Sequence, residues 1–297
     1  MRQREQPLCP CGPLHQRANG RDRCVRKMTY LAPSKGCPST TPQASDILRP
    51  RPSAALYSAK MYSRPVVASL RFPQTRQWVR RTYDAFKFDR AMRRFLDDPA
   101  AAIREGSSVL PDLIDAWGNS SWSALDEYLR VGVEHVIETD DAILECGTGL
   151  STLLFGAVAQ ARGIDYWALE HLPEWSDRIT HYLERYKTTE VRISTRPLRT
   201  YAGFDWYDPP LTEMPASFSL VICDGPPSQT IGGRYGLAPV MRTRLKPGCI
   251  ILLDDAEREH ERQIARQWQS ELDAQTEFLD GSKPLIRLVV RRNDTAR

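Results

Sequence analysis

The chain has 297 residues, of which 41% are hydrophobic, and this suits one sizeable globular domain with appended segments. Its sequence contains no apolar run near the roughly 20 residues that a membrane helix needs, which argues against a membrane-spanning protein. Residues 1–81 carry 16 Lys and Arg against 3 Asp and Glu, whereas the rest of the chain carries 25 against 34. The expected folded part is therefore acidic, and we expect no nucleic-acid partner for it.

The first 74 residues are rich in Pro, Ser and Arg and show little periodicity, so we predict a disordered basic leader. Four of the seven cysteines lie there without the paired Cys-x-x-Cys spacing of a zinc site. The other three, Cys146, Cys223 and Cys249, fall in or beside apolar strands, where a reduced thiol is a small apolar filler. Reduced thiols favour a cytoplasmic protein, although the Arg-rich start leaves an organelle transit peptide open.

Two helices are expected before the first strand. Residues 77–95 place aromatic side chains among many Arg and Lys, a pattern typical of a basic amphipathic helix, and packing on the body is favoured over membrane attachment. A second helix is expected over residues 123–136. We therefore predict a helical N-terminal cap over residues 75–138.

After residue 139, short apolar stretches alternate with helical stretches, which indicates a parallel sheet covered by helices. These stretches are residues 142–146, 164–170, 190–195, 218–224 and 249–254. Residues 276–279 and 284–290 flank an Asp280-Gly281 turn, which predicts a terminal hairpin and an antiparallel last strand. The predicted fold is thus an α/β domain over residues 139–297.

The most informative segment is residues 143–152, where an apolar strand ending near Glu145 gives way to a glycine turn and then to a helix over residues 150–161. Gly147 and Gly149 let the backbone turn and approach a ligand. Glu170 ends the next strand, roughly 20 residues on, where an acid accepts hydrogen bonds from ribose hydroxyls in nucleotide-binding sheets. A nucleotide-like cofactor is expected at this edge.

Two details distinguish between cofactors. Thr152 stands where the dinucleotide fingerprint has its third glycine, which disfavours NAD. Glu145 would repel a pyrophosphate but would attract the ammonium group of a methionine moiety. The charges therefore favour a cationic cofactor.

With these residues, the chain resembles the class I S-adenosylmethionine-dependent methyltransferases over about residues 120–292. The resemblance rests on four motifs in the family's order: the Glu145-to-Gly149 turn, Glu170, residues 218–227 and residues 245–255. It implies an enzyme with a Rossmann-like seven-stranded sheet, mostly parallel with an antiparallel terminal strand. It also implies a set of cofactor-binding residues, namely Glu145, Gly147, Gly149, Ser151, Thr152, Glu170 and Asp224.

The Gly-Thr-Gly-Leu-Ser-Thr form is most similar to the small-molecule O-methyltransferases, so a sugar or phenolic hydroxyl is the favoured acceptor. Asp224-Gly-Pro-Pro227 is also similar to the amine methyltransferase motif, but Gly225 is inserted and Ser228 replaces the aromatic residue, so N-methylation is the alternative. Two further classes stay open, an NAD-dependent oxidoreductase and a non-catalytic binding module.

Asp224 ends the fourth strand, and Asp254 and Asp255 end the fifth, so all three are expected at the carboxyl edge, with Asp224 and Asp254 as catalytic candidates. Converging carboxylates need a cation or protonation to relieve their repulsion. The resemblance implies Mg²⁺ held by these three acids, as in the metal-dependent O-methyltransferases. Alternatively, Asp224 contacts substrate or cofactor, and the other two cap a helix starting near Ala256.

Substrate contacts are predicted from Arg234 and Tyr235 in the glycine loop of residues 232–236, and from Trp122 as part of an aromatic lid. An ordinary glycine loop and core packing are the simpler alternatives for these positions. His171 and His260 are interpreted as solvated or structural rather than as general bases. A small-molecule substrate is expected, and a homo-oligomer is left open.

Overall fold

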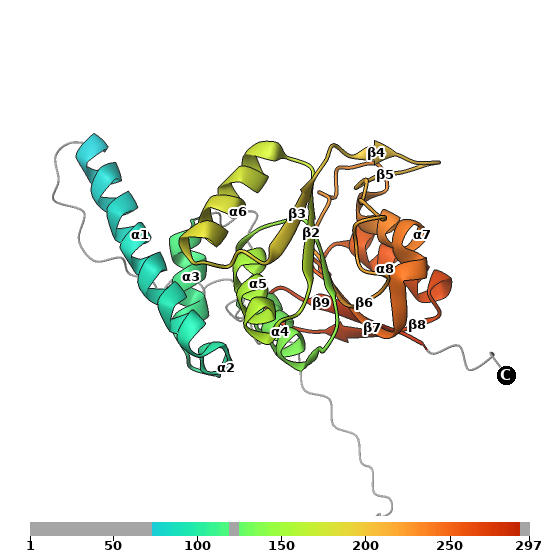
Figure 1. Cartoon of the computed structure of the whole chain (residues 1–297), viewed down its shortest axis with the longest axis horizontal. Coiled ribbons are helices and arrows are strands. Elements are labelled where there is room, and N and C mark those ends of the chain that lie inside the picture. Colours follow the sequence, from blue (N-terminus) through green and yellow to red (C-terminus); the bar gives the residue numbers. More distant parts are fainter. Residues whose placement is uncertain (1–72, 119–124, 292–297) are drawn as a thin grey trace, which may run out of the picture. The chain divides into compact units, whose positions relative to one another are not determined.

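The computed structural model describes residues 73–118 and 125–291, with side chains described from residue 78 (Figure 1). Nearly all of the predicted leader lies outside these residues, and so does Trp122. The division into leader, helical cap and methyltransferase domain stays a prediction. Within the described residues, no helix is both long and apolar enough to cross a membrane.

Seven strands of the described chain form one sheet in the order β3-β2-β1-β6-β7-β9-β8. Neighbouring strands are parallel except that β9 runs antiparallel to both β7 and β8. The strands are β1 (Ile143–Cys146), β2 (Tyr166–Glu170), β3 (Val191–Thr195), β6 (Phe218–Cys223), β7 (Leu245–Leu253), β8 (Ala274–Leu279) and β9 (Leu285–Val290). The predicted Rossmann-like methyltransferase sheet with an antiparallel terminal strand is confirmed.

Helices cover both faces of the sheet, as Figure 1 shows. One face carries α4 (Asp126–Glu138), α5 (Leu150–Arg162) and α6 (Pro173–Arg185), and the other carries α7 (Leu237–Met241) and α8 (Glu259–Glu271). Beyond α4 and α5 lie α1 (Pro73–Asp97), α2 (Pro99–Ala102) and α3 (Val109–Trp117). Because both faces are covered, β1, β2 and β6 are buried along their whole length, which explains why they read as continuous apolar runs.

Alternate strand residues enter two separate apolar clusters. Ile143 belongs to the cluster beneath α1, α3, α4 and α5, whereas Leu144 and Cys146 belong to the cluster beneath α7 and α8. Glu145 follows the parity of Ile143, so its side chain starts on the α4 and α5 face. Cys146, Cys223 and Cys249 are buried free thiols on strands, as the sequence predicts.

The α1 helix confirms one expectation and corrects another. Its buried face consists of Phe88, Met92 and Phe95, so packing on the body is confirmed. However, Trp78 and Phe86, two of the aromatic residues on which the predicted amphipathic pattern over residues 77–95 rests, are 67% and 66% exposed. The buried residues follow one another at intervals of four and three positions and so share one face of the helix. Trp78 and Phe86 lie on a different face.

The β7 strand begins at Leu245, earlier than the predicted residue 249. Leu245 pairs with Phe218, after which the register shifts so that Leu220 pairs with Ile250. Gly248 has a φ of 85° within this irregular segment, a conformation that suits glycine. The bulged strand therefore includes Lys246, Pro247 and Gly248, which do not form a turn before it.

The small hairpin of β4 (Arg199–Thr200) and β5 (Asp205–Trp206) was not predicted.

Candidate active site

The strand order reverses direction between β1 and β6, because the chain passes from β1 outward to β2 and β3 and then returns to β6. Ligands of open α/β sheets bind at such a switch point, outside the carboxyl ends of the strands. Backbone hydrogen bonds continue past the strand ends here: the Gly147 N–H donates to the Leu169 carbonyl at 2.9 Å, and the Asp224 N–H to the Cys146 carbonyl at 3.1 Å. The predicted motifs after β1, β2 and β6 thus meet at one edge.

In the glycine turn, Gly147 has a φ of 88°, whereas Gly149 is extended and forms the N-cap of α5. The Gly149 N–H donates to Thr152 Oγ1 at 2.9 Å, so the Thr152 hydroxyl caps the helix. A Cβ on Gly149 would have only Ser151 Oγ near it, at 3.7 Å. The space beside Gly149 is therefore open to a ligand.

Glu145 is 1% exposed and lies beneath this turn. Its two carboxyl oxygens accept hydrogen bonds from Ser151 Oγ at 2.6 Å and from the Tyr166 hydroxyl at 2.9 Å. Burial raises the pKa of Glu145 to about 7, although the hydroxyl donors oppose this rise. Glu145 and Ser151 thus support the turn from below, and a direct contact of either side chain with the cofactor stays a prediction.

Glu170 is 3% exposed at the end of β2. Thr148 donates to Oε2 from its amide at 3.1 Å and its hydroxyl at 2.7 Å, and the amides of His171 and Leu172 donate to Oε1 at 2.7 and 3.0 Å. Burial acts to raise the pKa of Glu170, but the His171 side chain, whose Nδ1 lies 3.2 Å from Oε1, outweighs it together with these hydrogen bonds, so the pKa lies below its usual value. The carboxylate is ionised, and its four acceptor positions are all in use.

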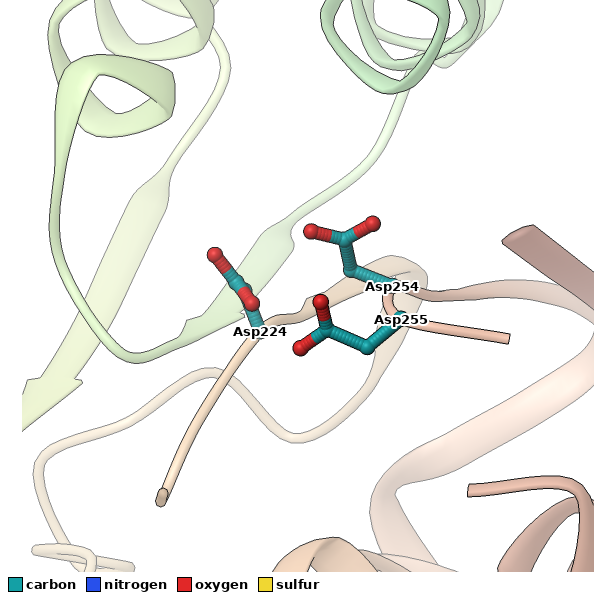
Figure 2. A group of neighbouring side chains, drawn as sticks. All are labelled: Asp224, Asp254 and Asp255. Atoms are coloured by element: carbon teal, nitrogen blue, oxygen red, sulfur yellow. The ribbon is translucent and has the colours of Figure 1, made fainter. Parts of the chain in front are cut away.

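The three predicted acids, Asp224, Asp254 and Asp255, do converge, because β6 and β7 are adjacent parallel strands and end side by side (Figure 2). Each offers a carboxylate oxygen, and these oxygens lie within 4.8 Å of one another. Asp254 and Asp255 are buried, while the Asp224 side chain is 28% exposed. The next helix, α8, begins at Glu259 and its N-cap residue is Arg258. The alternative in which Asp254 and Asp255 cap this helix is therefore wrong.

Protein cations surround these acids. Arg234 Nη2 lies 2.9 Å from Asp224 Oδ1 and 2.6 Å from Asp255 Oδ2, and Lys283 Nζ lies 2.7 Å from Asp254 Oδ2 and 2.9 Å from Asp255 Oδ1. Arg258 adds a contact of 2.8 Å to Asp255 Oδ2. We call Asp224, Asp254, Asp255, Arg234, Arg258 and Lys283 the charged cluster.

The acids of the charged cluster titrate differently. Burial, and then the charge of Asp254, raises the pKa of Asp224 to about 8 despite the guanidinium beside it. Burial also acts against ionisation of Asp255, but Arg234 and Lys283 bring its pKa below the usual value. Asp255 has a φ of 63°, and its carboxylate contacts hold this uncommon backbone conformation in place.

Of the predicted substrate residues, Arg234 and Tyr235 lie in the described part of the chain, and Arg234 is buried. Arg234 is 2% exposed, and its guanidinium also donates to the Asp254 carbonyl at 2.7 Å, so the expectation that it meets an anionic substrate is at odds with its position. The Tyr235 hydroxyl donates to Glu271 Oε1 at 2.8 Å on α8. The Arg234 side chain points inward because it pairs with buried acids, and the hydrogen bond to α8 fixes the position of the Tyr235 hydroxyl.

Sequence reasoning missed three residues near this edge. The Trp175 indole N–H donates to the Thr148 carbonyl at 2.6 Å, Tyr207 is buried with its hydroxyl against Gly225, and Lys283 reaches the acids from the turn between β8 and β9. Of these three residues, only Lys283 could have been placed near the site from the sequence. Because the last strand was predicted antiparallel, its turn had to lie at the carboxyl edge.

An open cavity of about 600 Å³ lies beside the β4–β5 hairpin. Its wall includes Arg196, whose amide donates to the Glu170 carbonyl at 3.0 Å, so the cavity borders the end of β2. The Arg196 guanidinium lies 3.9 Å from Asp208 and 3.7 Å from Glu213, and both acids also line the cavity. These contacts balance the charge of Arg196 within the cavity wall.

No family model matches the chain, and no curated protein matches it. Solved structures to which it is similar include an O-methyltransferase from Bacillus cereus in complex with S-adenosylhomocysteine (16% identity, TM-score 0.44, 65% of this chain and 94% of that chain). Another is a precorrin-6Y C5,15-methyltransferase from Geobacter metallireducens (14%, 0.43, 58% and 91%). A third is an RNA methyltransferase from Salinibacter ruber, also with S-adenosylhomocysteine (14%, 0.39, 59% and 97%). The order and direction of the seven strands, rather than these distant similarities, identify the fold as the Rossmann-like fold of the class I methyltransferases.

Proposed function

We propose that this chain transfers the methyl group of S-adenosylmethionine to a hydroxyl group of a small molecule. The observation that carries the proposal is the arrangement at the switch point: the glycine turn and Glu170 lie on one side of it, and the charged cluster lies on the other. One side suits a nucleoside cofactor, and the other suits a polar acceptor.

For the cofactor, Glu170 is the group that would hold the ribose hydroxyls, since it is ionised and stands at the end of β2. Thr148 Oγ occupies one of its oxygens at 2.7 Å and is the donor that a ribose hydroxyl would replace. The open space at Gly149, at the start of α5, suits the carboxylate end of the cofactor, because unpaired amides of a helix N-terminus attract anions.

The cofactor supplies an activated methyl group on a sulfonium. In the transfer, the acceptor oxygen bonds to the methyl carbon, the sulfur–carbon bond breaks with its electron pair on sulfur, and the hydroxyl proton passes to solvent. The chain then contributes mainly position and electrostatics.

A hydroxyl is favoured over an amine by the cations of the charged cluster. Arg258 and Lys283, whose side chains are 46% and 18% exposed, would stabilise the negative charge of an acceptor hydroxyl that has lost its proton before the transfer, whereas they would repel a protonated amine. The departure of residues 224–228 from the amine methyltransferase motif points the same way.

The predicted Mg²⁺ does not fit the residues as they are arranged. Its three expected ligands are present, but Lys283 Nζ bridges Asp254 and Asp255, and the Arg234 guanidinium bridges Asp224 and Asp255. A divalent ion would have to displace these cations or add charge beside them, which Coulomb repulsion opposes. The proposed transfer therefore uses this chain's own cations rather than a metal ion.

Titration calorimetry of the full chain with S-adenosylhomocysteine and with NAD tests the cofactor. We expect binding of the first and none of the second; the reverse result would favour the NAD-dependent oxidoreductase. Methyl transfer is then tested with labelled S-adenosylmethionine against matched panels of small hydroxyl and amine compounds. Label on hydroxyl compounds supports the proposal, label on amines alone supports the N-methyltransferase, and cofactor binding with no turnover on either panel supports a binding module.

A further inference from the structure

The charged cluster contains one cation that differs from the others in its position. The Arg234 side chain is 2% exposed and is surrounded by its hydrogen-bond acceptors, and the Arg258 side chain is 46% exposed at the periphery. Lys283 lies between these extremes at 18% exposed, and its ammonium bridges the two buried acids, Asp254 and Asp255. Its ammonium therefore lies between two of the three acids that the sequence predicts as metal ligands.

The fold holds Lys283 at this point. Because β9 is antiparallel to β7, with Leu253 paired to Ile286, the turn before β9 lies at the carboxyl end of β7. Ser282 Oγ donates to Glu127 Oε1 of α4 at 2.7 Å, and the Ala256 N–H donates to the Pro284 carbonyl at 2.9 Å. Contacts on both sides of Lys283 thus fix its backbone.

The charge of the two buried acids depends on Lys283. Asp254 Oδ1 and Asp255 Oδ1 are buried oxygens without a hydrogen-bond partner among the described residues, although Asp255 Oδ1 lies near Lys283 Nζ. The Lys283 ammonium, in contact with both carboxylates, compensates the charge that burial would otherwise leave unbalanced. Without the Lys283 ammonium, the negative charges of Asp254 and Asp255 would lack the cation that lies between them.

We propose that Lys283 fills the cation position of the charged cluster, so that the three acids form a site that is complete without a metal ion. The ammonium of Lys283 and the guanidinium of Arg234 together supply the positive charge that a divalent ion would bring. As an extension that rests on the proposed function, methyl transfer by this chain does not depend on a divalent metal.

Mn²⁺ alone is the probe, with binding to the full chain measured by electron paramagnetic resonance. We expect Lys283→Gln to bind Mn²⁺ at least tenfold more tightly than the wild type, because the substitution removes a cation and leaves the acids. Lys283→Arg keeps the charge and is expected to behave as the wild type. The matched control is Lys246→Gln, since Lys246 also forms a 2.7 Å ion pair with an acid, Asp141, but does so just before β1 at the other edge of the sheet.

Tight Mn²⁺ binding by the wild type overturns the proposal, and so does a Lys283→Gln variant that stays folded by circular dichroism and gains no affinity. If Lys283→Gln fails to fold, Mn²⁺ binding to the wild type and to Lys283→Arg still tests the proposal. Tight binding by either protein would show that the acids form a metal site. The second measurement is wild-type turnover with and without EDTA, where equal rates are expected. A wild type with no turnover would count against the proposed function alone, because the Mn²⁺ comparison does not use the reaction.

Discussion

Gly147 and Gly225 lie against each other, backbone to backbone, where the turns after β1 and β6 meet. A Cβ on Gly147 would lie 3.2 Å from the Gly225 nitrogen, and a Cβ on Gly225 would lie 3.0 Å from the Gly147 Cα and 2.4 Å from the Tyr207 hydroxyl oxygen. Gly147 thus serves the packing of the protein itself. Gly149, two residues later, has room for a Cβ and is the glycine that faces open space.

These two glycines should respond differently to alanine. Gly147→Ala is expected to destabilise the fold by at least about 1–2 kcal/mol, because its φ of 88° is unfavourable for a side chain. Gly149→Ala should cost less than about 1 kcal/mol as a weaker N-cap, but should lower the affinity for S-adenosylhomocysteine at least tenfold. Urea unfolding and calorimetry measure the two effects. Unchanged affinity in Gly149→Ala would show that the cofactor does not approach this turn.

Glu170→Gln should weaken S-adenosylhomocysteine binding by about 10- to 100-fold. Hydrogen bonds to a charged carboxylate contribute roughly 1.5–3 kcal/mol each, and the amide removes both the charge and one acceptor oxygen. Calorimetry measures the affinity, and Glu174→Gln, an exposed acid in the first turn of α6, is the control. Equal affinity of the Glu170→Gln variant and the wild type would remove Glu170 from the cofactor site.

Glu145 should make the stability of the fold depend on pH. Its folded-state pKa of about 7 lies above the usual 4.5, so its contribution is complete below about pH 4.5 and is lost as the pH rises through 7. Between pH 4.5 and pH 8 the loss is about 3 kcal/mol, from roughly 1.4 kcal/mol per pKa unit. Urea unfolding at pH 4.5 and pH 8 should show this loss in the wild type relative to Glu145→Gln, which cannot titrate. Parallel stability curves for the two proteins would contradict the raised pKa.

Trp175 should affect the cofactor through the turn. Trp175→Phe keeps a ring but removes the N–H that holds the Thr148 carbonyl at 2.6 Å, which should cost about 1 kcal/mol of stability and several-fold in S-adenosylhomocysteine affinity. Trp268→Phe removes a similar hydrogen bond, of 2.9 Å to the Tyr235 carbonyl, and should cost stability without affecting the cofactor. Equal effects of both variants on affinity would show that Trp175 acts on the fold alone.

Much of the sheet could be predicted because burial on both faces makes its strands continuous apolar runs. β1, β2 and β6 begin and end within two residues of the predicted bounds, and so does β3, although its residues are half-buried or exposed. Glu170 and Asp224 were found because each stands at the end of such a run. The two-residue strands β4 and β5 leave no comparable pattern, and the early start of β7 depends on the pairing of Leu245 with Phe218 across a bulge.

The charges of the site could be predicted only in part. That Asp224, Asp254 and Asp255 converge follows from their place at the ends of adjacent strands. Which cations meet them depends on the direction of a loop side chain, Arg234, and on the pairing of β9 with β7, which brings Lys283 to the site. The predicted antiparallel last strand places the turn with Lys283 at the carboxyl edge, but the sequence does not determine which way the Arg234 side chain points. The strand ends thus predicted that the three acids converge, whereas the Mg²⁺ came from the family resemblance, and Lys283 Nζ contacts two of its three expected ligands.

The hairpin of β8 and β9 has a consequence for how such a protein diversifies. The parts proposed to hold the cofactor come from β1 and β2, whereas Lys283 comes from a turn near the end of the chain. Mutations in residues 280–284 would then alter the acceptor side and leave the cofactor side intact. A library restricted to this turn should yield variants that differ in acceptor preference while sharing one affinity for the cofactor, so the two properties can be selected independently.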